Sequence, residues 1–72
     1  MRAYCFDFVN GDGSIDSYDI GAFGSDHEAE RQARDALLVS TTAIAVEVWS
    51  EGARLATIQR MAAQRRRMRL MG

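Results

Sequence analysis

Hydrophobic and polar residues alternate over residues 2–9, which is the pattern of a β-strand with one buried face. Successive side chains of a strand point to opposite faces. One face therefore carries three aromatic residues: Tyr4, Phe6 and Phe8. The opposite face carries Ala3, Cys5, Asp7 and Val9. We expect the aromatic face to form part of the core.

Two overlapping turn signals, Asn10-Gly11 and Asp12-Gly13, follow this strand. Asn-Gly and Asp-Gly pairs adopt positive φ readily, and this favours a tight β-hairpin. We predict a short returning strand at residues 14–17. Because two glycines follow closely, we predict a loop at residues 19–24.

Residues 25–42 have the pattern of a capped amphipathic helix. Ser25 and Glu28 are spaced as a capping box, in which both side chains bind free backbone N–H groups of the first turn. Apolar residues then recur at helical spacing: Ala29, Ala33, Ala36 and Leu37. A stripe of small residues lets a helix lie close to a sheet. The β-branched residues at 39–42 predict the end of the helix.

Two further strands are predicted in the second half of the chain. Residues 42–50 alternate again, and a turn at Glu51-Gly52 lets residues 53–60 pair back as a fourth strand. The order strand-strand-helix-strand-strand predicts an α+β fold, a small antiparallel sheet with one helix on one face. The expected core is Tyr4, Phe6, Phe8, Leu37, Ile44, Val46 and Val48.

Residues 61–72 are rich in arginine and in good helix formers. We interpret them as a short C-terminal helix or a tail that follows a single domain at residues 1–60. Acidic residues dominate the first half of the chain and arginines the second, although the formal net charge is only −1. Such a chain can associate head to tail or present its basic end to an anionic partner.

The length of the chain limits how much stability one hydrophobic core can supply. A domain of 72 residues hides only about 60% of its extended surface on folding, so a partner, a disulfide or a metal is a common aid. The single cysteine excludes an internal disulfide. No apolar run approaches the about 20 residues of a membrane span, and the start lacks a signal-peptide pattern. We expect a cytoplasmic protein without a membrane partner.

The order of these features resembles a family of short bacterial proteins of unknown function. The resemblance covers residues 2–58, and it rests on Phe6-Asp7 in the first strand, the Asp12-Gly13 turn, and Ala29 and Ala33 in the helix. The chain departs from the family pattern in a shorter helix-to-strand connection and in its arginine-rich end. The resemblance implies the α+β fold and assigns no chemistry.

The glycine-rich turn also resembles a calcium loop of the EF-hand type, and especially a dockerin repeat. If Gly13 is aligned with the loop glycine, the ligand positions fall on Asn10, Asp12, Ser14, Asp16 and Asp19. The first ligand position falls on Phe8, however, and no second loop follows. We therefore expect a plain hairpin turn without a metal, and calcium binding is the alternative.

Catalytic constellations are nearly absent from the sequence. The one histidine, His27, lies in the first helical turn, and Cys5 lies in mid-strand on the face away from the helix. We do not expect these two groups to meet as a nucleophile and its base. The Gly-Asp-Gly turn precedes a strand, whereas a phosphate-binding loop needs a helix N-terminus. We predict a protein that is not an enzyme and uses no cofactor.

One helix covers only one face of a four-stranded sheet, so the other face must be polar or meet a partner. The alternation makes that second face apolar, with Ala3, Cys5, Val9, Ala43, Ala45 and Trp49. Apolar patches of this kind mark association sites, and the residues expected to form the interface are Cys5, Val9, Ala45 and Trp49.

These observations favour a protein-interaction or regulatory module that forms a homodimer, through this face or by pairing of edge strands. The segment 61–71 could cover the same face instead. One alternative function is nucleic-acid binding through Arg60, Arg65, Arg66, Arg67 and Arg69. Another is a phage-type inhibitor that binds a host protein, by analogy at the level of the fold.

Overall fold

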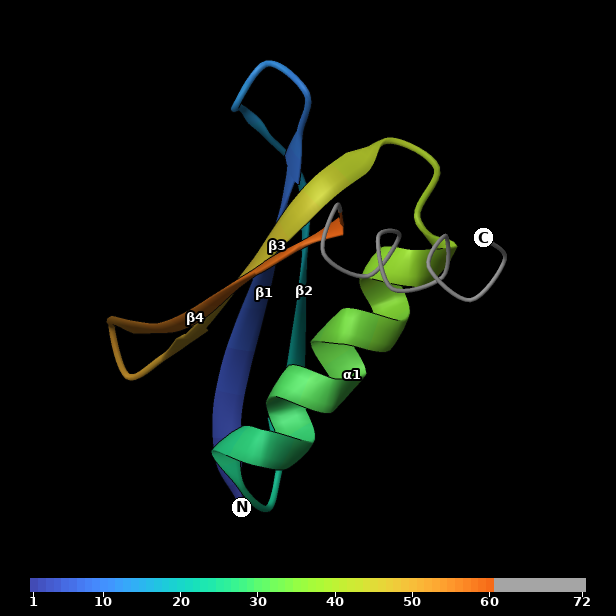
Figure 1. The fold of residues 1–72 in the computed structure, drawn as a ribbon. Coiled ribbons are helices and arrows are strands. Elements are labelled where there is room, and N and C mark those ends of the chain that lie inside the picture. The colour runs from blue at the N-terminus through green and yellow to red at the C-terminus, as the bar shows by residue number, and fades with distance from the viewer. Residues whose placement is uncertain (61–72) are drawn as a thin grey trace.

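The computed structural model describes residues 1–60, which form one four-stranded antiparallel sheet and one helix (Figure 1). The elements are β1 (Arg2–Asn10), β2 (Ile15–Phe23), α1 (Asp26–Val39), β3 (Ala43–Ser50) and β4 (Ala53–Gln59). Across the sheet the strand order is β2-β1-β3-β4. The expected α+β fold and its element order are confirmed. The helix or tail expected at residues 61–72 lies outside the described residues.

Both hairpins turn where the sequence predicts. In the first, the N–H of Gly13 donates to the carbonyl of Asn10 at 3.0 Å, and Gly13 has a φ of 88°. In the second, Glu51 and Gly52 have φ values of 53° and 78°. In this second hairpin both central residues have positive φ, and this turn geometry matches the right-handed twist of paired strands.

The helix α1 has the predicted N-terminal cap. The Ser25 hydroxyl accepts a hydrogen bond from the N–H of Glu28, and the Glu28 carboxylate accepts one from the N–H of Gly24, both at 3.2 Å. At the other end, the N–H of Ser40 donates to the carbonyl of Leu37. Within residues 1–60, no helix is long and apolar enough to cross a membrane.

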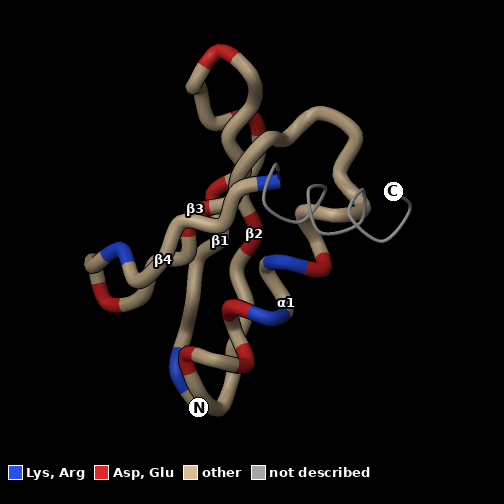
Figure 2. Tube along the Cα trace, viewed as in Figure 1, with Lys and Arg blue, Asp and Glu red and all other residues tan. Residues whose placement is uncertain are grey.

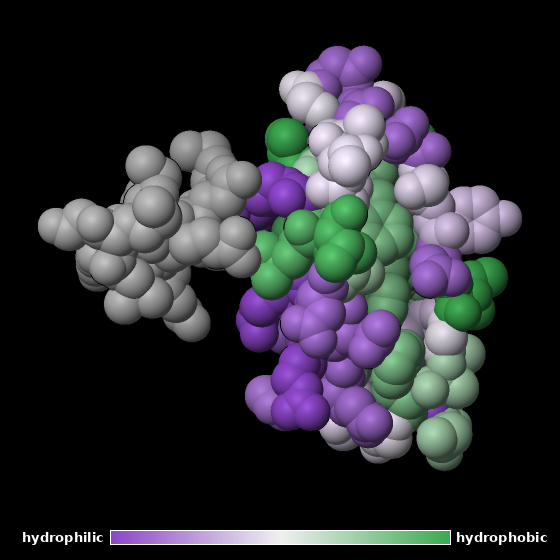
Figure 3. All heavy atoms as spheres, turned by 90° about the vertical axis from the view of Figure 1, so that its right-hand side faces the viewer, coloured by the Kyte–Doolittle hydropathy of each residue, from purple (hydrophilic) through white to green (hydrophobic). Residues whose placement is uncertain are grey.

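The core lies between α1 and one face of the sheet. Its buried members are Tyr4, Phe6, Ala29, Ala33, Leu37, Ala43, Val46 and Val48. Because three of these are alanines, the helix packs close to the strands. The side of the molecule in Figure 3 shows polar residues over most of its surface, with hydrophobic residues between them. Leu38 and Val39, in the last helical turn, are exposed.

The second strand is longer than predicted, and the expected loop at residues 19–24 is wrong. A Cβ added at Gly21 would lie 2.9 Å from a ring carbon of Phe23, so the ring occupies the space of the missing side chain. That ring stacks on Phe6 with a centroid distance of 5.7 Å. Gly21 therefore makes room for an aromatic ring inside a strand and does not reverse the chain.

A β-bulge at the start of β3 changes the expected core. Val9 pairs with Ala45 and Asn10 pairs with Ala43, so Ile44 is an extra residue in β3. Ile44 is 48% exposed, whereas Ala43 is 2% exposed and belongs to the core. The expected core position of Ile44, and the place of Ala43 on the opposite face, are both wrong for this reason.

Candidate interaction surface

The face of the sheet opposite α1, called the open face below, consists of rows of side chains that the strand register sets side by side. From β2 to β4, the rows are Ile20, Cys5, Trp49 and Arg54; Tyr18, Asp7, Glu47 and Thr57; and Ile15, Val9, Ala45 and Gln59. Directly opposed residues of neighbouring strands have Cβ atoms about 5 Å apart. The open face is thus a continuous surface of twelve residues in three rows.

The four residues predicted for an interface, Cys5, Val9, Ala45 and Trp49, all lie on the open face. Ala45 is buried and the other three are partly buried. The structure brings them together in two of the three rows, on the central strands β1 and β3.

The most exposed apolar residues of this face lie on β2 and are not among the expected interface residues. Ile15, Tyr18 and Ile20 are 54%, 68% and 67% exposed. The alternation of Tyr18, Ile20 and Ala22 is the signal that reveals them, but Gly21 interrupts it and is typical of a loop. The open face therefore extends over β2 and is more hydrophobic than expected.

Charged residues occupy the middle row of the open face. Asp7 and Glu47 are directly opposed on β1 and β3. Arg54 lies 3.3 Å from the Glu47 carboxylate, while the ion pairs among residues 1–60 include none to Asp7. Asp7 instead accepts a weak hydrogen bond from the Cys5 thiol at 3.4 Å. Burial, with this hydrogen bond and the charge of Asp7, raises the pKa of Cys5.

The free edge of β2 carries two carboxylates that hinder pairing with another strand. Asp16 is an extra residue in β2, because Phe8 pairs with Ser17 and Val9 with Ile15, and its side chain accepts a hydrogen bond from Thr42 at 3.1 Å. The carboxylate of Asp19 accepts the N–H of Ile20 at 3.0 Å. Bulges and charged side chains are common means of protecting an edge strand.

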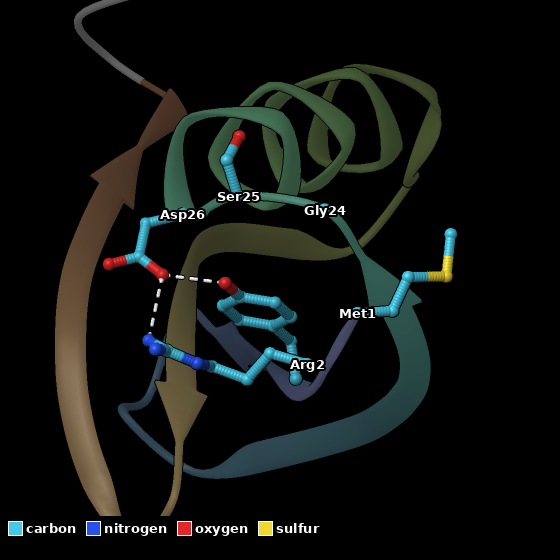
Figure 4. Close-up of a pocket in the computed structure, with 6 residues that line it drawn as sticks. Met1, Arg2, Gly24, Ser25 and Asp26 are labelled. Carbon is cyan, nitrogen blue, oxygen red and sulfur yellow. Dashed lines mark hydrogen bonds and ion pairs between the residues drawn. The ribbon is translucent and has the colours of Figure 1, made fainter.

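A hollow of about 420 Å³ lies where β1 meets the start of α1 (Figure 4). The Tyr4 hydroxyl donates to Asp26 at 2.5 Å, and this bond raises the pKa of Tyr4. The guanidinium of Arg2 lies 3.5 Å from Asp26 and 3.6 Å from Glu51. These polar groups satisfy one another and hold the helix against β1.

The residues of the calcium alternative separate into two places. In the turn, Asp12 accepts hydrogen bonds from the N–H and the hydroxyl of Ser14 at 2.9 Å and 2.7 Å, and these bonds lower the pKa of Asp12. Asn10 lies in the same turn. Asp16 binds Thr42 instead, and Asp19 lies farther along β2 opposite Phe6. Residues 1–60 contain no cluster of three or more His, Cys, Asp or Glu arranged to hold a metal.

Of the arginines predicted for nucleic-acid binding, Arg60 is the one that lies in the described part of the chain. Its guanidinium donates to the backbone carbonyls of Leu37, Ser40 and Ala43. Arg65, Arg66, Arg67 and Arg69 lie outside the described residues. The basic positions of residues 1–60 lie at several separate places along the chain trace (Figure 2).

Cys5 and His27 are not brought together. Cys5 lies on the open face, whereas His27 is exposed on α1, on the other side of the sheet.

Comparison with known proteins adds no further constraint: no family model, curated protein or solved structure matches the chain.

Proposed function

We propose that the protein is a non-enzymatic interaction module that forms a homodimer through the open face. The observation that carries the proposal is the exposure of Ile15, Tyr18 and Ile20 on the same face as Trp49 and Val9. Contiguous exposed apolar surface is uncommon on monomeric proteins and marks association sites. Among residues 1–60, no helix or loop covers this face, since α1 packs on the opposite one.

A second copy is the occupant that fits the size of the face. From Ala3 to Val9 a strand extends about 20 Å, and four strands span about 14 Å between the outer strand axes, or about 19 Å with the width of the outer strands included. Two such faces in contact remove roughly 1,000 Å² from water once side-chain relief is included, which is at the lower end of specific interfaces. This supports a weak or moderately stable dimer and a function that depends on concentration.

Pairing of β2 edges is the other route to a dimer, and the structure offers less support for it. Asp19 already binds the N–H of Ile20, and the extra residue Asp16 bends the strand. The open face instead offers two outer rows that hold apolar residues of β1, β2 and β3.

Sedimentation equilibrium on matched variants tests the proposal. Ile20→Arg and Trp49→Arg each place a cation in the row that contains Ile20, Cys5 and Trp49. Each change should weaken the dimer at least about tenfold, which corresponds to about 1.4 kcal/mol. Val39→Arg is the control, because it also replaces an apolar residue by arginine but lies on α1, outside the open face, where Val39 is 81% exposed. Circular dichroism establishes that each variant is folded.

A folded wild-type protein that stays monomeric over the micromolar to millimolar range would rule out the homodimer. A dimer that tolerates both arginine variants would overturn the open face as the interface and assign association to another surface, such as the β2 edge.

A further inference from the structure

We infer that protons control association of the proposed homodimer, through the carboxylates of Asp7 and Glu47 in the middle row of the open face. This inference rests on the proposed function, since it concerns the same face. Its physical origin is the position of the carboxylates: they lie at the centre of the face, between two apolar rows.

The symmetry of a face-to-face dimer brings these carboxylates together. If the two-fold axis runs along the strands midway between β1 and β3, β1 lies over β3 of the second copy, and Asp7 faces the second Glu47. If the axis runs across the strands through the middle row, Asp7 faces the second Asp7 and Glu47 the second Glu47. Both arrangements place a carboxylate against a carboxylate, because the rows and the strand order are fixed by the register.

The groups around Asp7 do not neutralise its charge. On its own strand the neighbour is Cys5, across β2 it is Tyr18, and across β3 it is Glu47. The one cation on the twelve positions of the open face is Arg54, which already pairs with Glu47 at 3.3 Å. Asp19, the nearest acid of β2, is directly opposed to Phe6 and so lies on the side of the sheet that faces α1.

Each copy therefore brings one uncompensated carboxylate into an interface that excludes water. Like charges that share a site favour protonation of one of them. The dimer takes up protons as it forms, and its dissociation constant must fall as the pH falls. If one proton is taken up per dimer, the dissociation constant falls about tenfold for each unit by which the pH is lowered. This holds over the pH range in which the proton is taken up on association.

The experiment measures dimer dissociation constants by sedimentation between about pH 7 and about pH 5, below which carboxyl groups of model peptides begin to titrate. The wild type should dimerise several-fold more tightly at the lower pH. Asp7→Asn keeps the shape and removes the charge, so it should dimerise more tightly than the wild type at about pH 7 and respond less to pH. Asp35→Asn is the control, because Asp35 is exposed on α1 and should leave the wild-type behaviour unchanged.

The outcomes distinguish this inference from the proposed function. A protein that is monomeric at every pH, with or without Asp7, contradicts both. A dimer that Ile20→Arg dissociates, but whose dissociation constant depends neither on pH nor on Asp7→Asn, overturns proton control and leaves the homodimer intact. An equal tightening by Asp7→Asn and Asp35→Asn would show an effect of net charge alone and would also overturn the inference.

Discussion

The Nε atom of Arg60 lies 2.7 Å from the carbonyl oxygen of Ala43 and donates a hydrogen bond to it. A second nitrogen of the same guanidinium donates to Leu37 and Ser40 at the end of α1. The last helical turn has no basic residue of its own, so the cation that stabilises the negative end of the helix comes from the residue that follows β4. One side chain thus joins the helix, the connection to β3, and the end of the sheet.

Replacement of Arg60 by alanine should lower the free energy of unfolding by about 2 kcal/mol, because three partly buried carbonyls lose a charged donor. Arg60→Lys should recover only part of this, since an ammonium cannot reproduce the planar fork. Urea denaturation measures both changes. Arg31→Ala, on the exposed side of α1, is the control, and a loss at Arg60 no larger than at Arg31 would contradict the capping role.

The bulge in β3 predicts that the smaller of two truncations is the more damaging. Val46→Ala removes fewer atoms than Ile44→Ala, but Val46 is fully buried and Ile44 is half exposed. We expect a loss of about 2 kcal/mol for Val46→Ala and less than about 1 kcal/mol for Ile44→Ala. Thermal unfolding of the two variants gives the order, and the opposite order would place Ile44 in the core.

The first hairpin turn provides a comparison between two glycines. Gly13 has a φ of 88°, which strains a residue with a side chain, whereas Gly11 has neither a positive φ nor any atom within 4 Å of an added Cβ. Gly13→Ala should lower stability by about 1 kcal/mol. Gly11→Ala should leave stability unchanged or raise it slightly. Denaturant unfolding measures both, and equal effects would mean that the turn geometry differs.

The thiol of Cys5 should react slowly and only at raised pH. Burial and the neighbouring carboxylate of Asp7 raise its pKa, so the reactive thiolate forms above the ordinary value of about 8.5. Because the folded-state pKa is the higher one, the stability that this group contributes is complete below the ordinary pKa and declines as the pH rises past it. Alkylation with iodoacetamide across pH, with the urea-unfolded chain as reference, measures the midpoint. A midpoint at or below that of the unfolded chain would contradict this environment.

Much of the fold could be predicted from local patterns. The alternation in residues 2–9, the Asn-Gly and Glu-Gly turns, and the Ser25 cap each specify a short-range geometry, and the structure contains all of them. The interface residues expected on β1 and β3 also share the open face, because alternation alone assigns a strand residue to a face.

The sequence predictions are wrong or incomplete where a contact between distant parts of the chain decides the structural role of a residue. Gly21 is a strand residue because the Phe23 ring fills the space above it, and no property of residues 19–24 alone reveals that ring's position. Ile44 lies outside the core because it has no partner residue in β1: Val9 pairs with Ala45, and Asn10 pairs with Ala43. Arg60 binds carbonyls of α1, of the connection to β3 and of β3 itself, which lie at least 17 positions earlier, so no local motif reveals these contacts.

The strand order has a consequence for how the chain reaches its final form. The two hairpins are built from neighbouring segments, but β1 meets β3 only after the intervening chain has closed, as in the bond from Ser50 to the carbonyl of Ala3, 47 positions away. Closing a long loop costs entropy before the new contacts form, so the pairing of β1 with β3 should be the slow step in folding. During synthesis the first hairpin is complete before β3 exists, and one edge of β1 stays open until then.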